Sequence, residues 1–243
     1  MKLSENDFKN YTAILREELI PAMGCTEPIA IAYAAAMARK ILGEMPTRMT
    51  VNCSGNMIKN VKGVTVPNSG GQKGIEVAAI LGMVGGDPDK KLEVIAGVTD
   101  EDREECRKLN ETKICDVNLA ENVPNLYIEI IMASEEHTAC VRIAYHHTDI
   151  VYISKDQEVL RDVEHEVKEE ATQGIVCTDR NKMSLQGLLE YANTVDLAEI
   201  KDVIQRQIEM NSRISQEGLD NAWGAQIGKT ILGNWGHDVR TEA

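Results

Sequence analysis

The chain has 243 residues, of which 43% are hydrophobic and 27% charged, and its formal net charge is −13. This length is enough for one large domain or two modest ones, and the acidic balance makes nucleic acid and anionic membranes poor partners. No apolar run approaches the ~20 residues of a membrane span, and residues 1–7 lack the apolar core of a secretory signal. We therefore expect a cytoplasmic protein.

Two helices are predicted at the start of the chain. Ser4 and Asp7 have the spacing of a capping box, and apolar residues at helical spacing follow them until Pro21 ends the first helix. An alanine-rich helix is expected over residues 26–41, with Gly43 as its C-terminal stop. So many small side chains predict that this helix packs closely against a neighbour.

The middle of the chain predicts an alternation of strands and helices. Short apolar runs predict strands at residues 49–53, 61–66, 92–98, 114–119, 126–134, 139–145 and 150–154. Helices are predicted over residues 71–84 and from a cap at Thr99 to about Leu109. From about Glu158 the pattern returns to helices, over residues 185–192, 197–210 and 219–232.

These elements predict an α+β fold in two parts. A helical catalytic layer (residues 1–45 and 160–243) is interrupted by an inserted α/β module (residues 46–158) with a mostly antiparallel or mixed sheet. Residues 238–243 have helix-forming character without a stop signal, which predicts that the helical part is truncated at its C-terminal end.

Six cysteines are spread along the chain without a C-x-x-C pair, and their spacings match no zinc pattern. They are Cys25, Cys53, Cys106, Cys115, Cys140 and Cys177. In a reducing cytosol disulfides are not expected, so the general interpretation is a buried cysteine that acts as a small hydrophobe. Cys25 is the exception.

Cys25 lies in the segment Pro-Ala-Met-Gly-Cys-Thr-Glu-Pro, directly before the alanine-rich helix. Gly24 permits a sharp turn, and Pro28 fits the first turn of a helix, where a missing N–H costs nothing. The free N–H groups and the dipole of a helix start stabilise negative charge and predict a lowered thiol pKa. The position is compatible with a structural cysteine, a metal ligand or a nucleophile.

The string from Gly24 to Ala36 resembles the signature of the L-cysteine desulfidase family, whose relatives include the α-type domains of iron–sulfur L-serine dehydratases. Three further stretches are similar to that family: Asn56–Asn60 with Val64–Pro67, Leu92–Val94, and His147–Val151. The resemblance covers nearly the whole chain, and Gly-Cys-Thr-Glu-Pro is its most specific element.

The resemblance implies an amino-acid lyase with a [4Fe–4S] cluster held by three cysteines, of which Cys25 matches the first. The other two belong to a C-terminal half that this sequence lacks, so the chain alone is expected neither to hold the intact cluster nor to be active. In such an enzyme the open iron acts as a Lewis acid on the β-thiol of L-cysteine. A base removes the Cα proton, and pyruvate, ammonia and sulfide are formed.

Residues for acid–base work and for the substrate carboxylate are predicted from residue type and position. His147 is the candidate acid or base, and its alternative is a hydrogen-bonding residue at a strand end, with His146 facing the opposite side. The Gly-rich turns at residues 54–56 and 68–71 are candidate carboxylate sites, because such turns direct N–H groups at anions, although most are simple turns. Lys59 is either a partner of the substrate carboxylate or an exposed turn residue. The predicted substrate-binding residues are Ser54, Asn56, Lys59, Asn68 and Ser69.

Several alternatives remain at this stage. L-Serine in place of L-cysteine would release water, and a non-catalytic module that binds an amino acid or associates with a partner gains weight from the truncation. A nicotinamide enzyme is disfavoured because no G-x-G-x-x-G follows a strand, and nothing indicates pyridoxal phosphate. The expected partners are the small-molecule amino acid, the missing C-terminal half and, as a further arrangement, a second copy in a homodimer.

Overall fold

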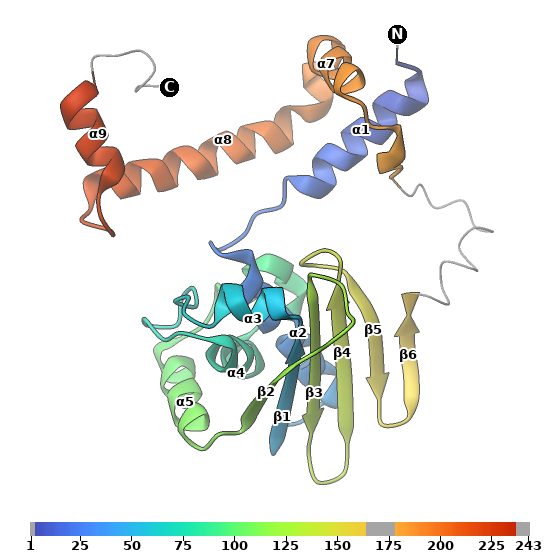
Figure 1. Cartoon of the computed structure of the whole chain (residues 1–243), viewed down its shortest axis with the longest axis vertical. Coiled ribbons are helices and arrows are strands. Elements are labelled where there is room, and N and C mark those ends of the chain that lie inside the picture. Colours follow the sequence, from blue (N-terminus) through green and yellow to red (C-terminus); the bar gives the residue numbers. More distant parts are fainter. Residues whose placement is uncertain (1–2, 164–177, 237–243) are drawn as a thin grey trace. The chain divides into compact units, whose positions relative to one another are not determined.

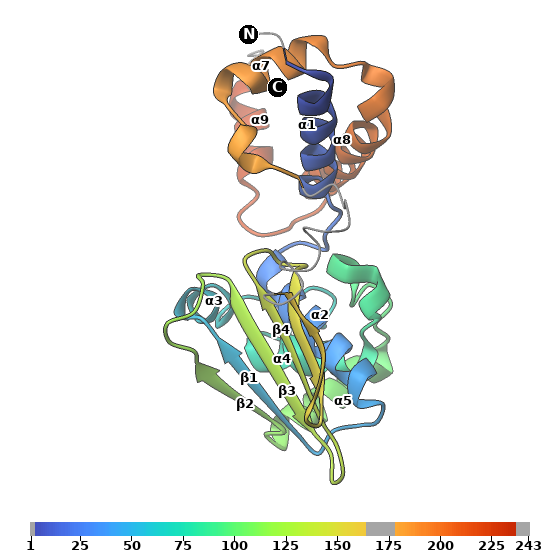
Figure 2. The same cartoon turned by 90° about the vertical axis from the view of Figure 1, so that its right-hand side faces the viewer.

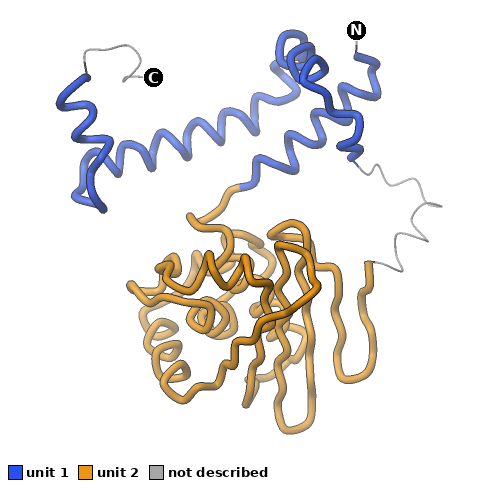
Figure 3. The backbone as a smooth tube through the Cα atoms, in the orientation of Figure 1, with its two compact units in different colours: residues 1–20, 176–243 blue, residues 21–175 orange. Residues whose placement is uncertain are grey.

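A computed structural model of the chain describes residues 3–163 and 178–236. The residues form two compact units, one made of residues 1–20 and 176–243 and the other of residues 21–175 (Figure 3). The predicted boundary at residue 45 is therefore displaced to residue 20, because the alanine-rich helix packs on the sheet. Cys177 and the predicted helix start at residues 238–243 lie outside the described residues.

The larger unit is built on a six-stranded sheet with helices against it (Figure 1). Its elements are α2 (Thr26–Leu42), β1 (Arg48–Cys53), α3 (Gly55–Val61), α4 (Ile75–Gly85), η1 (Pro88–Glu93), α5 (Asp100–Glu111), β2 (Cys115–Leu119), β3 (Tyr127–Ala133), β4 (Thr138–Ala144), β5 (Ile150–Lys155) and β6 (Glu158–Asp162). The strand order is β2-β1-β3-β4-β5-β6, in which β1 and β2 are parallel and the other neighbours antiparallel. The prediction of an α+β fold with a mostly antiparallel, mixed sheet is confirmed.

The core lies between the sheet and the helices α2 and α4, which cover one of its faces (Figure 2). Alternate residues of β1 and β3 are fully buried, as the two-residue period of a strand requires. These side chains are Met49, Val51 and Cys53 on β1 and Ile128, Ile130 and Met132 on β3. Eleven of the 17 residues of α2 are buried, so the helix is enclosed on most of its surface.

Helices α2 and α4 approach each other through small residues. A Cβ atom built at Gly82 would lie 2.2 Å from the carbonyl oxygen and 2.6 Å from the Cα of Ala32. One built at Gly86, directly after α4, would lie 2.9 Å from the Cβ of Ala36. The close packing predicted from the alanines of α2 is confirmed, and its partner is a glycine-containing helix.

Capping explains where several elements begin and end. Ser4 and Thr99 cap the starts of α1 (Glu5–Glu18) and α5, as predicted, and both form complete capping boxes. Gly43 ends α2 in the left-handed conformation with a φ of +88°, also as predicted. Helix α4 begins four residues later than predicted, after Gly74, whose φ is +101°.

Three predicted elements in this unit are wrong. Residues 61–66 are not a strand, because the short helix α3, which Ser54 caps, extends through Val61 and a turn follows it. Residues 92–98 form the end of η1 and turns, although their apolar side chains are buried. The return to helix expected at Glu158 is replaced by β6, an edge strand whose mostly exposed residues carry no alternating apolar pattern.

The smaller unit consists of α1 (Glu5–Glu18), η2 (Arg180–Lys182), α7 (Leu185–Thr194), α8 (Leu197–Asp220) and α9 (Ile227–Trp235). Its buried cluster contains Tyr11, Ile14 and Tyr191, with the rings of Tyr11 and Tyr191 edge-to-face at 5.6 Å. Arg16 of α1 pairs with Asp202 of α8 at 2.8 Å. Helix α8 is ten residues longer than predicted, and no described helix of the chain is long and apolar enough to cross a membrane.

The α2–α4 contact yields a stability prediction. Gly82→Ala places a methyl group where Ala32 backbone already lies, so we expect a loss of about 1–3 kcal/mol in the free energy of unfolding. Gly97→Ala is the matched control, since no atom lies within 4 Å of its Cβ position. Urea unfolding of both variants measures the difference, and an unchanged midpoint for Gly82→Ala would show that the two helices separate freely.

Candidate functional site

Cys25 is the N-cap residue of α2 and its side chain is exposed. Gly24 before it has a φ of +107°, a left-handed conformation that glycine adopts without strain. The turn thus delivers the thiol to the start of a helix, as the sequence predicted. Cys25 makes no side-chain capping bond to the helix, and its thiol is directed to another partner.

Glu27 is that partner and connects three side chains around the helix start. Its Oε2 accepts a hydrogen bond from the Sγ of Cys25 at 3.2 Å and one from the Oγ1 of Thr26 at 3.4 Å. Its Oε1 accepts one from the Nδ2 of Asn60 at 3.3 Å. Asn60 belongs to α3, so two helices supply the groups around the carboxylate.

His147 joins this cluster from the opposite end of the sequence. Its Nε2 lies 3.2 Å from the Oγ1 of Thr26, which in turn contacts Glu27. The residue is half-buried in the turn between β4 and β5 rather than on a strand. The expectation that His146 and His147 face opposite sides of a strand is therefore wrong, and the turn itself brings His147 to the start of α2.

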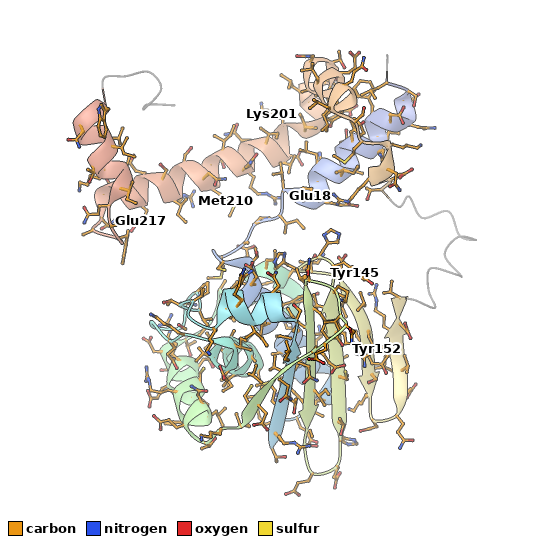
Figure 4. The ribbon with its side chains drawn as sticks, viewed as in Figure 1. Glu18, Tyr145, Tyr152, Lys201, Met210 and Glu217 are labelled. Carbon is orange, nitrogen blue, oxygen red and sulfur yellow. The ribbon has the colours of Figure 1, made fainter. Side chains whose placement is uncertain are left out.

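Figure 4 marks Tyr145, the first residue after β4, at the end of the sheet where this turn begins. Tyr145 has a φ of +69°, which is uncommon for a residue with a side chain. Its backbone N–H donates to the carbonyl of Leu126, and the N–H of Ala144 donates to the carbonyl of Asp149. These bonds fix the turn that carries His147.

The electrostatics of the cluster differ from the simple helix-start prediction. Burial, followed by the hydrogen bond that the thiol donates to Glu27, raises the pKa of Cys25 above its ordinary value. Burial also opposes ionisation of Glu27, but hydrogen bonds led by that from Cys25 outweigh it and lower the Glu27 pKa. The prediction of a lowered Cys25 pKa is therefore wrong, because partial burial of the thiol and the carboxylate beside it both disfavour the thiolate.

Burial lowers the pKa of His147, and the nearby Glu27 only partly opposes that effect. At neutral pH the cluster thus contains a neutral imidazole, an ionised Glu27 and a protonated Cys25 thiol. A neutral imidazole can accept a proton, which is the state that a general base requires.

The predicted carboxylate-binding residues of the first turn lie on or beside α3. Ser54 is buried and caps α3, since its Oγ accepts from the N–H of Met57 and donates to the carbonyl of Asn125. Asn56 and Lys59 are exposed on the same short helix. Lys59 immediately precedes Asn60, which reaches the Glu27 carboxylate.

The second predicted cradle is tied into its own loop. Asn68 donates from Nδ2 to the carbonyl of Ile95 at 2.9 Å and accepts a hydrogen bond from Arg103 at its Oδ1. Ser69 is fully buried, and its hydroxyl donates to the carbonyl of Gln72 at 3.0 Å. These two side chains are thus engaged in shaping the loop.

The other described cysteines do not gather around Cys25. Cys53, Cys106 and Cys115 are buried, and Cys140 is half-buried on β4. Burial raises the pKa of Cys53 and Cys115 to about 12 and that of Cys106 and Cys140 to about 11. Within residues 3–163 and 178–236, no group of three or more His, Cys, Asp or Glu residues is arranged to hold a metal ion. The described residues therefore do not fit an intact [4Fe–4S] cluster, because they offer it one accessible thiol.

The roles of three residues in this cluster were not predicted from the sequence. Thr26 and Glu27 lie inside the Gly-Cys-Thr-Glu-Pro segment, and Asn60 lies in the second family-like stretch, so their positions were marked but their roles were not. Their contacts with one another and with His147 depend on the packing of α2, α3 and the β4–β5 turn.

The chain is similar to several bacterial proteins that carry the name "UPF0597 protein", which states no activity. It is 44% identical over 97% of its length to one from Lachnoclostridium phytofermentans, of which it covers 55%. It is 46% identical over 92% of its length to the protein from Finegoldia magna, and 40% identical over 96% of its length to the one from Treponema denticola. It covers 53% of each of these two relatives. The chain spans about half the length of these curated relatives.

No family model and no solved structure matches the chain. The similarity to UPF0597 proteins extends over nearly all of the sequence, whereas the resemblance to cysteine desulfidases and serine dehydratases stays a prediction.

The Cys25–Glu27 contact predicts how the thiol responds to alkylation. Glu27→Gln removes the negative charge that disfavours the thiolate, so the Cys25 pKa should fall. Well below that pKa, each unit by which it falls raises the thiolate fraction about tenfold. Iodoacetamide should therefore modify Cys25 faster at pH 8 in the variant, as measured by mass spectrometry of the Cys25 peptide.

Glu44→Gln serves as the control for this experiment, because Glu44 is an exposed acid just beyond the other end of α2. It should leave the Cys25 alkylation rate unchanged. An equal or slower rate in Glu27→Gln would show that the Glu27 carboxylate does not hold the proton on the thiol.

Proposed function

We propose that this chain supplies part of the active site of an amino-acid lyase that converts L-cysteine and water to pyruvate, ammonia and hydrogen sulfide. The observation that carries the proposal is the cluster at the start of α2, where an exposed thiol and a half-buried imidazole are connected through Glu27 and Thr26. The resemblance of the Gly-Cys-Thr-Glu-Pro segment to cysteine desulfidases supports the same activity.

His147 is the proposed general base of the elimination. Its lowered pKa keeps the imidazole neutral at neutral pH, so it can accept the proton from Cα of the substrate. The electron pair of the C–H bond then forms the Cα–Cβ double bond as the C–S bond breaks. The sulfur leaves with the electron pair of that bond as hydrosulfide, which takes up a proton to give hydrogen sulfide. The aminoacrylate that results tautomerises and is hydrolysed to pyruvate and ammonia.

Thr26 has a positioning role in this proposal. Its hydroxyl lies within hydrogen-bond distance of both the Glu27 carboxylate and the Nε2 of His147. When the hydroxyl donates to Glu27, its oxygen accepts a hydrogen bond from Nε2–H, so the neutral ring carries its hydrogen on that nitrogen. This arrangement fixes the imidazole and leaves Nδ1 as the basic atom.

The substrate carboxylate is assigned to Lys59 and Asn56, which are exposed on α3 beside Asn60. An exposed ammonium group pairs with a carboxylate at a modest cost in solvation. Ser54, Asn68 and Ser69 contribute indirectly, through the shapes of α3 and the following loop.

The [4Fe–4S] cluster enters the proposal through the family resemblance. Cys25 would be its one ligand in this chain, and the remaining thiolates would have to come from outside the chain. The longer relatives, of which the chain covers about half, have room for such residues.

L-Serine is the alternative substrate, with water as the leaving group. The two substrates differ at the β-substituent, where thiol and hydroxyl differ in size and in affinity for metals. A non-catalytic module is the alternative from another class, and the single accessible thiol among the described residues favours it for the chain by itself.

The chain alone should release neither sulfide from L-cysteine nor pyruvate from L-serine after anaerobic reconstitution with iron and sulfide. Among the described residues Cys25 is the one exposed thiol, and one thiol cannot hold a cluster that needs three. Sulfide is measured by methylene blue formation and pyruvate by coupled reduction. Robust turnover by the 243-residue chain would show that its own residues suffice and would contradict the requirement for outside ligands.

His147→Gln tests the catalytic role in the chain co-produced with the unmatched segment of the Lachnoclostridium phytofermentans relative. A general base contributes about 10²- to 10⁴-fold, so turnover per intact cluster should fall by that factor while iron content stays unchanged. His146→Gln is the matched control, because His146 is its exposed neighbour in the same turn, and it should remain within a few-fold of the parent. Equal effects of the two variants would remove His147 from the reaction.

A further inference from the structure

The smaller unit exposes far more apolar surface than the larger one. Of the 19 exposed large hydrophobic residues among those described, 14 belong to this unit, which has about half as many described residues as the other. Its compact cluster, by contrast, consists of Tyr11, Ile14 and Tyr191 with a few partly buried neighbours. Exposed apolar residues mark an interaction site where they gather on one face.

One stripe along α8 shows where covering is absent. Ile200, Val203, Met210 and Ile214 lie on one helix face, because successive members are three, seven and four residues apart. Ile200 and Val203 are 8% and 3% exposed, whereas Met210 and Ile214 are 40% and 70% exposed. The same stripe is thus buried at its N-terminal end and open beyond it.

The difference follows from the extent of α1. Arg16 near the C-terminal end of α1 reaches the carbonyl of Glu199 and the carboxylate of Asp202, so α1 packs on the first turns of α8. Figure 4 marks Lys201, Met210 and Glu217 in order along α8, and the helix continues well past α1 and α7. An isolated helical extension is weakly stable in water unless its apolar side is covered.

Helix α9 repeats the pattern. Ile227, Ile231 and Trp235 are four residues apart and lie on one side of the helix, and they are 67%, 40% and 60% exposed. No residue of α9 is buried. The α8 stripe and this face of α9 are each exposed, and we refer to Met210, Ile214 and these three residues together as the α8–α9 apolar surface.

We propose that the α8–α9 apolar surface is the docking site for a helical segment with its own apolar stripe, from the part of the longer relatives that has no counterpart in this chain. The 236 residues matched to the Lachnoclostridium phytofermentans protein are 55% of that relative, which leaves roughly 190 residues in it. A helix laid along a helix by its apolar stripe is the usual way to cover such a face. A second copy of this chain is a poorer occupant, since each copy carries a net charge of −13.

The proposal does not depend on the lyase activity and is tested by binding. The tagged chain is co-produced with the unmatched segment of the Lachnoclostridium phytofermentans relative, and the stoichiometry of the purified complex is measured by size-exclusion chromatography with light scattering. We expect a one-to-one complex. Ile214→Glu, and separately Met210→Glu, place a charge in the stripe and should lower the recovery of the segment at least tenfold.

Ser212→Glu is the matched control. Ser212 is exposed on the side of α8 opposite to the stripe, so the same added charge should leave recovery unchanged. Circular dichroism checks that all three variants keep their helix content, which is expected because each substitution is at an exposed position.

Three outcomes would overturn the proposal. The first is failure of the segment to co-purify with the unaltered chain. The second is equal loss of binding in Ser212→Glu and Ile214→Glu, or no loss in either. The third is a homodimer of the chain by itself that Ile214→Glu dissociates, because the surface would then be an interface between copies.

Discussion

The close crossing of α2 and α4 is the constraint on which the candidate site depends. Gly82 admits the backbone of Ala32 at a distance that any side chain would prevent. Because α2 is held in this way against α4 and packs on β3 and β4, its first turn has one position relative to the end of the sheet. The contact that fixes Cys25 and Glu27 in space thus lies in the core and not in the site. Glycine and alanine at the helix crossing let the two backbones approach closely and fix their relative position.

The second half of the site depends on a turn, and its geometry is equally determined. The register of β4 and β5 shifts between Arg142 and Ile143, and Tyr145 takes up a left-handed conformation directly after β4. A single residue in this conformation is tolerated where the surroundings fix it, and such positions concentrate at functional sites. The hydrogen bond between His147 and Thr26 closes the connection between two segments that are 121 residues apart in the sequence.

Local signals in the sequence were sufficient where one element carries its own start and stop. The capping boxes of α1 and α5 and the glycine that ends α2 predicted these helices, and alternation predicted β1, β3 and β4. Residues 92–98 were wrongly predicted as a strand because their apolar side chains are buried in turns. The edge strand β6 was missed because its residues are mostly exposed and show no alternating apolar pattern. The Cys25 pKa was predicted in the wrong direction because the sequence showed the helix start, but neither the burial of the thiol nor its hydrogen bond to the Glu27 carboxylate. Asn60 required the packing of α3 and could not be recognised from spacing.

The two units therefore stand in different relations to the groups outside them. The larger unit closes a core around its sheet and holds the Cys25 thiol protonated, because burial first, and then the hydrogen bond to Glu27, raise the pKa of Cys25. Removing that proton at neutral pH requires a compensating positive charge, such as that of a metal ion. Among the described residues no group of ligands is arranged to hold a metal ion. The smaller unit lacks a cover for part of its apolar surface, since the apolar stripe of α8 continues beyond the end of α1. We propose that both deficiencies are met from outside these 243 residues. A polypeptide would cover α8 and α9, and further thiolates would join Cys25. Docking and ligation nevertheless involve different atoms. A charge introduced into the α8 stripe should therefore weaken docking of the segment without changing the rate at which Cys25 is alkylated.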